Sequence, residues 1–218
     1  MADIPLKYAL PFIALAALPL VYVTAGPLVA ALSPTSQMAN HYTEKEADDT
    51  VAACSAMKGR LDALTTAQVD TTDCTVDFST STALLAVLLL RNERGEKLTK
   101  SYIGHIERID KGKWDATDVA QGVAPRPSGT LFNYDSALAA SGACGTIAID
   151  LVAKFPMLLW GKDEKDCEVN FDGKTSATVT LSFMTNETPS RLRKYAGRVE
   201  RNKNTILGWV TTAMAKND

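Results

Sequence analysis

Ser55 and Lys58 are the residues whose types and spacing most directly suggest chemistry. In the stretch Ser55-Ala-Met-Lys58, the spacing places the lysine amine one helical turn from the serine hydroxyl. A neutral amine there can take the hydroxyl proton and turn the serine into a nucleophile. The same spacing also arises by chance in a chain rich in serine and lysine. A serine hydrolase using Ser55 and Lys58 is therefore the second alternative, and an exposed turn of a helix is the favoured interpretation.

The four cysteines suggest disulfides more strongly than metal binding or catalysis. They are Cys54, Cys74, Cys144 and Cys167, an even number without any C-x-x-C pair. Only two histidines accompany them, so a zinc site of the usual Cys/His type is not expected. Two disulfides are expected, in a chain that meets an oxidising compartment. The pairing Cys54–Cys74 with Cys144–Cys167 closes the shorter loops and is favoured, although sequence alone leaves the other pairings open.

An apolar stretch near the N-terminus, Tyr8 to Leu32, contains no charged residue. It exceeds the roughly 20 residues that cross a bilayer as a helix, so residues 1–32 are predicted to form a retained transmembrane anchor. Prolines at Pro11, Pro19 and Pro27 each remove a backbone hydrogen bond. Because lipid cannot satisfy the freed groups, these kinks suggest packing against partner helices.

Secretion after signal cleavage is the main alternative to anchoring. Small residues before Gly26 and Leu32 permit cleavage near Ala25 or Ala31, which would release an exported ligand-binding protein. The balanced N-terminal charges of the first seven residues, MADIPLK, make a poor signal start. Lys7 before the apolar stretch and an acidic run after it favour a cytoplasmic N-terminus, with the bulk of the chain outside the cytoplasm.

Downstream of the anchor, a polar connector is expected at residues 33–42 and one domain at residues 43–218. The first predicted element is a helix over 43–66, which opens with the capping-box spacing of Thr43 and Glu46. The others are a short strand over 74–79, a buried strand or helix over 83–90, a hairpin in which the turn-like 91–97 leads into an alternating strand over 98–109, a long surface loop over 110–129, a partly helical segment over 136–155, a hairpin around Asp172-Gly173, and a helix from Pro189 to about Lys216. No internal repeat is evident. This order predicts an α+β domain, with helices packed on an antiparallel sheet.

The last predicted helix would carry a basic face opposite its apolar one. Its members are Arg191, Lys194, Arg198 and Arg201. Solvation is the usual reason for such a face, and contact with an acidic partner subunit or with anionic lipid headgroups is the alternative. The predicted surface loop adds Trp114 as a second candidate contact residue.

Together these features predict a non-enzymatic, single-pass membrane-anchored structural or assembly subunit. Its extracytoplasmic domain, in the periplasm or on a cell or virion surface, is expected to contact other protein subunits, with the lipid bilayer contacted through residues 8–32. The formal net charge of −2 gives no general attraction to nucleic acid. No catalytic constellation other than the Ser55–Lys58 pair is evident, and no cofactor, metal or small-molecule substrate is expected.

Overall fold

The computed structural model describes residues 37–65, 69–71, 73–89, 94, 98–122, 129–155, 166–185, 189 and 191–217. The chain divides into two units, residues 1–35 and residues 36–218, and every described residue lies in the second. The predicted transmembrane anchor, its prolines Pro11, Pro19 and Pro27, and the possible cleavage sites near Ala25 and Ala31 lie outside the described residues.

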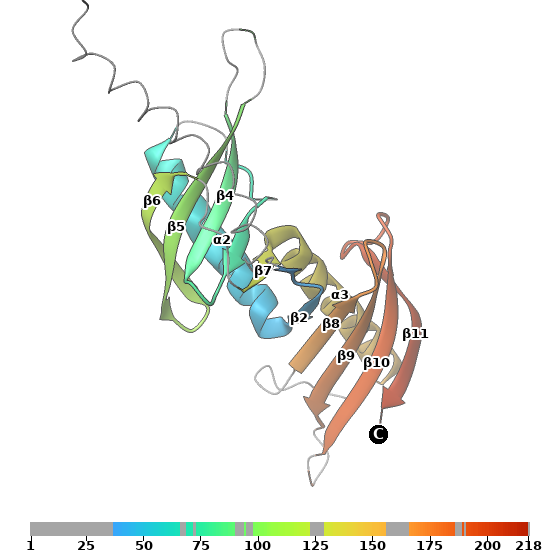
Figure 1. The fold of residues 1–218 in the computed structure, drawn as a ribbon. Helices are drawn as coiled ribbons and strands as arrows, with labels where there is room; N and C mark the ends of the chain where they lie inside the picture. The colour runs from blue at the N-terminus through green and yellow to red at the C-terminus, as the bar shows by residue number, and fades with distance from the viewer. Residues whose placement is uncertain are drawn as a thin grey trace, which may run out of the picture. The chain divides into compact units, whose positions relative to one another are not determined.

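The described chain forms two sheets (Figure 1). The first has the order β1-β7-β3-β4-β5-β6, with strands Gln37–Met38, Thr130–Asn133, Thr75–Asp77, Thr82–Leu89, Leu98–Asp110 and Lys113–Gln121. All of its pairs are antiparallel except β1 with β7. The second sheet is antiparallel throughout, in the order β11-β10-β9-β8-β2, with strands Trp209–Asn217, Leu192–Arg201, Ser176–Met184, Asp166–Phe171 and His41–Thr43.

Each sheet is covered by one long helix (Figure 1). Helix α2 (Glu44–Leu64) begins with the capping box expected from sequence, in which Thr43 and Glu46 satisfy each other's free backbone N–H groups. Helix α3 (Tyr134–Lys154) begins at Asn133, whose side chain accepts from the Ser136 N–H. Two hydrophobic clusters result, one centred on each helix. The mixed α+β composition is thus confirmed, with two sheets where one was expected.

The two sheet-and-helix units are copies of one topology. In residues 41–121 a strand, a helix of 21 residues and a four-stranded antiparallel meander follow one another, as β2-α2-β3-β4-β5-β6. In residues 130–217 the same order recurs as β7-α3-β8-β9-β10-β11, again with a helix of 21 residues. We call these segments the first and second halves. The opening strand of each half pairs with the first meander strand of the other, β2 with β8 and β7 with β3.

Burial and cross-linking repeat at equivalent positions of the two halves. Cys54 near the middle of α2 is bonded to Cys74, and Cys144 near the middle of α3 is bonded to Cys167. This is the pairing favoured from sequence, so the prediction of two short-loop disulfides is confirmed. The buried helix positions also match in order: Ala47 with Ala137, Thr50 with Ala140, Ala53 with Ala143, Met57 with Ile147, and Leu61 with Leu151.

A shared sequence motif supports the duplication. Strand β5 reads Tyr102-x-Gly-x-Ile-Glu-Arg108, and β10 reads Tyr195-x-Gly-x-Val-Glu-Arg201. The glycines are needed because each lies under its helix. A side chain at Gly104 would come 2.6 Å from the Met57 sulfur, and one at Gly197 would collide with Ile147. Met57 and Ile147 are themselves equivalent, so the same close approach of sheet and helix occurs twice.

A row of aromatic rings crosses from one half to the other. From first half to second, the neighbouring centroids lie 5.4, 5.5, 5.6, 5.9 and 6.1 Å apart along Trp114, Phe78, Phe132, Tyr42, Phe171 and Trp209. Each ring on one side of the central Tyr42–Phe132 pair has its equivalent on the other. Arg108 lies over Trp114 at one end and Arg201 over Trp209 at the other. The exchanged strands therefore join the two cores into one continuous packing unit.

The structure contradicts the helix predicted from Pro189 to Lys216. Residues 192–201 and 209–217 form strands β10 and β11. Along β10 the buried residues Tyr195, Gly197 and Val199 alternate with outward-facing ones, which is the period of a strand. The helical wheel was misleading because apolar residues at spacings of three and four can coincide with this alternation at some positions. Pairing with β9 then decides the conformation.

One further prediction is wrong in part, because the expected surface loop over 110–129 contains strand β6. The hairpin expected to include the alternating strand over 98–109 is confirmed, since β5 pairs antiparallel with β4. The helix predicted over 43–66 and the hairpin around Asp172-Gly173 are confirmed, with Gly173 at a φ of 94° in its turn. Of the two possibilities left open for 83–90, the structure has a strand, β4. The prediction that the chain has no internal repeat is also wrong, because the two halves repeat one order of elements.

Helix α3 is the one helix among the described residues that is long and apolar enough to cross a membrane, with a mean hydropathy of 1.5. It lies mid-chain, whereas the predicted membrane helix is N-terminal. Its buried residues pack into the hydrophobic cluster of the second half, and Cys144 is bonded to a strand of that half. Its apolar composition is therefore explained in large part by its place under a sheet.

Candidate functional site

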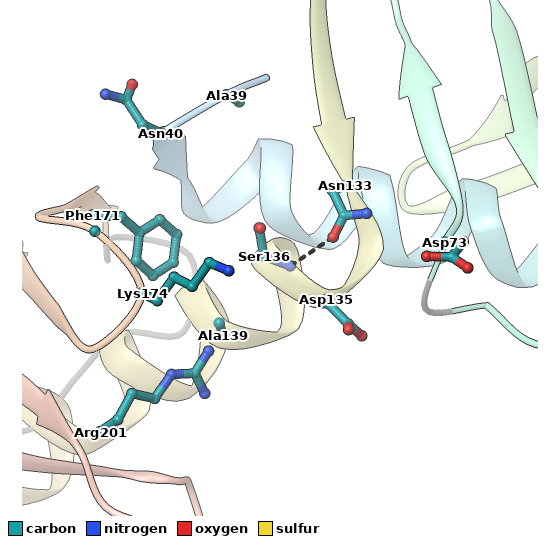
Figure 2. Close-up of a pocket in the computed structure, with 11 residues that line it drawn as sticks. Ala39, Asn40, Asp73, Asn133, Asp135, Ser136, Ala139, Phe171, Lys174 and Arg201 are labelled. Carbon is teal, nitrogen blue, oxygen red and sulfur yellow. Dashed lines mark hydrogen bonds between the residues drawn. The ribbon is translucent and has the colours of Figure 1, made fainter. Parts of the chain in front are cut away.

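A cavity of about 620 Å³ opens at the N-terminal end of α3 (Figure 2). Its walls come from both halves and include one aromatic ring, two basic and two acidic side chains. The lining residues are Ala39, Asn40, Asp73, Asn133, Asp135, Ser136, Ala139, Phe171, Gly173, Lys174 and Arg201. We call it the α3 cavity.

A hydrogen bond across the strand exchange positions Asn133, which lines the α3 cavity. Tyr42 of β2 accepts a hydrogen bond at its hydroxyl from the Asn133 backbone N–H at 3.2 Å. Burial raises the pKa of the Tyr42 hydroxyl, and the Asn133 hydrogen bond opposes that shift. Asn133 in turn caps α3 through Ser136 at 3.2 Å. These two hydrogen bonds therefore link strand β2 to the first turn of helix α3.

Two cations enter the α3 cavity from the second half (Figure 2). Lys174 extends from the β8–β9 turn, and Arg201 ends β10 with its guanidinium carbon 4.2 Å from the centroid of the Trp209 ring. Neither forms an ion pair with any residue that the structure describes. Stacking on the indole fixes the plane of the guanidinium, so the edge of Arg201 is presented in a defined orientation.

Asp73 and Asp135 line the other side of the α3 cavity (Figure 2). The pKa of Asp135 is raised above the usual range of an aspartate, first by desolvation and then by repulsion from Asp70 and Asp73. Longer-range attraction to Arg201 lowers the same pKa. The cavity therefore has a basic side and an acidic side.

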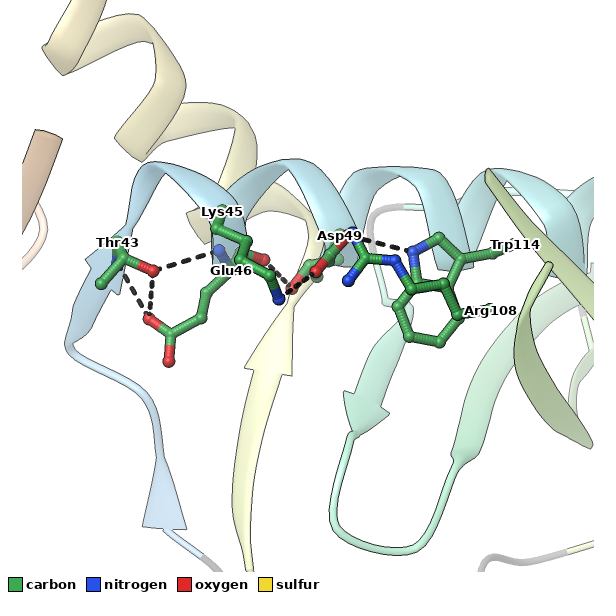
Figure 3. A network of polar contacts seen from close by, with 7 residues as sticks. Thr43, Lys45, Glu46, Asp49, Arg108 and Trp114 are labelled. Atoms are coloured by element: carbon green, nitrogen blue, oxygen red, sulfur yellow. Dashed lines mark hydrogen bonds and ion pairs between the residues drawn. The ribbon is translucent and has the colours of Figure 1, made fainter. Parts of the chain in front are cut away.

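The equivalent place in the first half holds a cluster of paired charges around Asp49 (Figure 3). There the Asp49 side chain, only 7% exposed, accepts hydrogen bonds from Arg108 at 3.3 Å and from the Trp114 indole at 3.2 Å. Lys45 lies 2.9 Å from the other oxygen of the same carboxylate. Asp49 thus serves as the counterion shared by Arg108 and Lys45.

Both carboxylates of the first-half cluster are missing from the second half. Alignment of α2 with α3 places Ala139 at the position of Asp49 and Ser136 at the position of Glu46. The Trp209 indole donates to the Ala139 backbone oxygen at 2.9 Å, where Trp114 uses the Asp49 side chain. The arginine is retained and its internal counterion is lost. Ala139 lies on the wall of the α3 cavity.

An exposed apolar surface is the second candidate functional feature. It consists of Leu138, Ile149 and Val152 on the outer side of α3, with Ile206 and Leu207 in the β10–β11 turn. Two glycines of α3 leave room for the turn to lie against the helix. A side chain at Gly142 would lie 2.8 Å from the Leu207 backbone oxygen, and one at Gly145 would lie 3.1 Å from the Leu207 side chain. We call this surface the α3 face.

The corresponding side of α2 is polar. Leu138, Ile149 and Val152 correspond to Asp48, Gly59 and Asp62. Ile206 is fully exposed and Ile149 is 61% exposed. Since α2 occupies its place in the same fold without apolar residues at these positions, the fold itself does not require them on α3.

The basic residues predicted to share a helix face are separated by the strand. Lys194 and Arg198 are exposed on the outer side of β10, where Arg198 lies 3.8 Å from Asp172. Arg201 lines the α3 cavity, and Arg191 precedes the strand. Trp114 lies in β6, with its ring in the aromatic row, and is not in a surface loop. A role of these residues in partner or lipid contact remains a prediction.

Ser55 and Lys58 lie on α2, where each has another partner. The Ser55 hydroxyl donates to the Val51 backbone oxygen at 2.7 Å, and the Lys58 amine pairs with Asp62 at 2.5 Å. Neither residue lines the α3 cavity. Among the described residues no group of three or more His, Cys, Asp or Glu side chains is placed to hold a metal ion.

Comparison of the chain with models of protein families, with curated proteins and with solved structures found no match. The assignment of residues to the candidate site therefore rests on the geometry of this structure alone. The sequence did not predict that Arg201 and Lys174 line the same cavity, or that Ala139 lies on its wall. The signal that could have found them is the repeat itself, since Asp-Cys-x-Val-x-Phe occurs at 73–78 and again at 166–171, each ahead of the Tyr-x-Gly motif.

Proposed function

We propose that this protein is a non-enzymatic, single-pass membrane-anchored assembly subunit whose duplicated domain binds another protein subunit of the same membrane or envelope complex. The observation that carries the proposal is the α3 face. Its core residues are Leu138, Ile149 and Val152, with Ile206 and Leu207 beside them. A contiguous exposed apolar patch of this type is typical of a surface that is covered by a partner.

Because the domain is duplicated, the outer side of α3 can be compared with the outer side of α2. Two helices with the same role in the same topology have evolved different outer surfaces, one polar and one apolar. Fold stability does not account for the difference, because α2 shows that the outer positions tolerate Asp48 and Asp62. A binding function specific to the second half accounts for it directly.

A protein is favoured over a lipid surface as the occupant of the α3 face. Asp135 and Asp150 lie on α3 beside the apolar residues, and carboxylates are repelled by anionic headgroups. Polar and charged residues around an apolar centre are the usual arrangement of a protein interface. Lys154 at the end of the helix and Lys203 in the β10–β11 turn complete such a rim.

The sequence of the first unit supports membrane anchoring. The uncharged stretch Tyr8–Leu32 is long enough to span a bilayer, and four residues separate it from the first described strand at Gln37. The two disulfides agree with an extracytoplasmic address.

The experiment is co-purification of the full chain from its native membrane in mild detergent. The variant Ile149→Asp places a charge in the centre of the α3 face, and Gly59→Asp is the matched control on α2. We expect the partner subunit recovered with the wild-type chain to be recovered with Gly59→Asp and lost with Ile149→Asp, while both variants keep their disulfides. Equal recovery with both variants would contradict a partner contact at the α3 face.

A further inference from the structure

We propose that the α3 cavity binds the carboxylate of a small aminocarboxylate ligand, an α-amino acid or a compound with the same two charged groups. Arg201 and Lys174 hold the carboxylate, in the place that Asp49 fills in the first half. The inference rests on the comparison of the two halves and does not depend on the proposed function.

The first half shows what this place in the fold is built to hold. An arginine stacked on a tryptophan, with a second cation nearby, surrounds one nearly buried carboxylate, that of Asp49. Hydrogen bonds between charged partners are the stronger ones in proteins, because charge and geometry act together. The arrangement is therefore a carboxylate-binding site whose carboxylate is supplied by the chain itself.

The second half keeps the arginine and the tryptophan of this arrangement, omits the carboxylate, and has Asp135 at the position of Lys45. Arg201 stacks on Trp209 at 4.2 Å, more closely than Arg108 lies over Trp114 at 5.9 Å. Lys174 supplies the second cation from a different element than Lys45 does. At Ala139 the side chain that carried the carboxylate is reduced to a methyl group on the cavity wall. No carboxylate at position 139 neutralises Arg201 and Lys174, so an external carboxylate can reach these two cations.

The opposite side of the α3 cavity specifies the second group of the ligand. Asp73 and Asp135 lie there, and desolvation together with repulsion from its acidic neighbours raises the Asp135 pKa. A cation placed beside these carboxylates would relieve that repulsion. A volume of about 620 Å³ admits a small molecule. A ligand with a carboxylate at one end and an ammonium group at the other matches both sides.

The binding test uses the full chain in mild detergent, with glycine as the probe and glycinamide as the control that lacks the carboxylate. The Trp209 indole N–H is the reporter in ¹⁵N-labelled protein, because that ring lies under Arg201. The Trp114 indole N–H is the internal reference, since it already donates to the Asp49 carboxylate. We expect a saturable shift of the Trp209 signal with glycine and none with glycinamide.

Three variants connect the signal to the proposed groups. Ala139→Asp supplies the carboxylate from within, as in the first half, and should abolish glycine binding while the protein stays folded. Arg201→Gln should weaken binding at least tenfold. Arg198→Gln removes a neighbouring charge on the outer side of β10 and should bind as the wild type does.

Three results would overturn the inference. One is the absence of any saturable Trp209 shift with glycine in the wild-type chain. Another is an equal shift with glycinamide, which would show that the carboxylate is not recognised. The third is unchanged glycine binding in Ala139→Asp, which would place the ligand elsewhere. None of these measurements involves a partner protein or membrane anchoring, so their failure would leave the proposed function untouched.

Discussion

Asp49 and Ala139 occupy equivalent positions in helices α2 and α3, yet only Asp49 supplies a counterion to the arginine that its half places beside a tryptophan. Asp49 is paired with Arg108 and Lys45, whereas the α3 cavity opens beside Ala139. This one difference leaves the arginine of the second half without the internal carboxylate that the first half supplies. The predictions below follow from the paired comparison.

Removal of Asp49 should destabilise the domain. In Asp49→Ala, the Arg108 guanidinium and the Trp114 indole lose their acceptor, at a cost of about 1–3 kcal/mol for groups that are only partly solvated. Asp62→Ala is the control, because its ion pair with Lys58 is exposed and exposed pairs contribute about 0–1 kcal/mol. Urea unfolding of both variants would measure the two losses. A loss no greater in Asp49→Ala than in Asp62→Ala would show that the Asp49 cluster is not structural.

The two motif glycines should respond alike to substitution. Gly104→Ala pushes a methyl group into Met57, and Gly197→Ala pushes one into Ile147, so each should cost about 1–3 kcal/mol as an overpacked core does. Gly59→Ala on the exposed side of α2 meets nothing within 4 Å and should stabilise the helix by about 0.8–1 kcal/mol. Thermal unfolding distinguishes the signs. Similar melting temperatures for all three variants would argue against the close sheet–helix approach.

Strand exchange predicts that neither half folds without the other. Residues 36–122 would lack β7 beside β3, and residues 129–218 would lack β2 beside β8. Each would also lose part of the aromatic row. Separately produced halves should therefore show little dispersion in their amide NMR spectra, while the intact domain unfolds in one transition. A well-dispersed spectrum of either half alone would contradict this view of the core.

Each disulfide should contribute about equally to stability. The loops closed by Cys54–Cys74 and Cys144–Cys167 have sequence separations of 20 and 23, and loops of this size stabilise a domain by about 3 kcal/mol in the chain-entropy account. Replacing either pair by serines should lower the unfolding free energy by that amount. The measurement is denaturant unfolding of each double variant under oxidising conditions. A loss confined to one pair would indicate unequal strain or unequal residual structure in the unfolded halves.

Asp135 should titrate at a higher pH than an ordinary aspartate. Its raised pKa means that the charged form is less favourable in the folded protein than in the unfolded chain, so its contribution to stability falls as pH rises through the folded-state pKa. Carbon-detected NMR of the Asp135 carboxyl would follow the titration. Arg201→Gln should raise the pKa further and Asp73→Asn should lower it. Shifts in the opposite directions would contradict the arrangement of charges in the α3 cavity.

The sequence predicted several local features well. The capping box at Thr43, the Asp172-Gly173 turn and the two short disulfide loops each depend on residues close together in the chain, and each is present. The Pro189–Lys216 segment was misread because its strand conformation is decided by pairing with β9, a contact between distant residues. Strand β6 was missed in the predicted surface loop because its conformation is decided by pairing with β5.

The candidate site was less accessible to sequence reasoning than the fold. Arg201, Lys174 and Asp73 come from separate elements, and only the strand exchange brings them around one cavity. The function of Ala139 is defined by what it lacks, which can be recognised only after α2 and α3 have been aligned. The repeated Asp-Cys-x-Val-x-Phe and Tyr-x-Gly motifs would have permitted that alignment from sequence alone.

The most direct test of the central claim, that the second half carries a protein-binding face which the first half lacks, is site-specific photo-crosslinking of the full chain in its native membrane. A photoreactive residue is placed at Ile149 on the α3 face or at Gly59, the equivalent position on α2. We predict one discrete protein adduct from position 149 and none from position 59, with the adduct abolished by Val152→Asp. Adducts of equal yield from both positions, or adducts only to lipid from position 149, would contradict the claim.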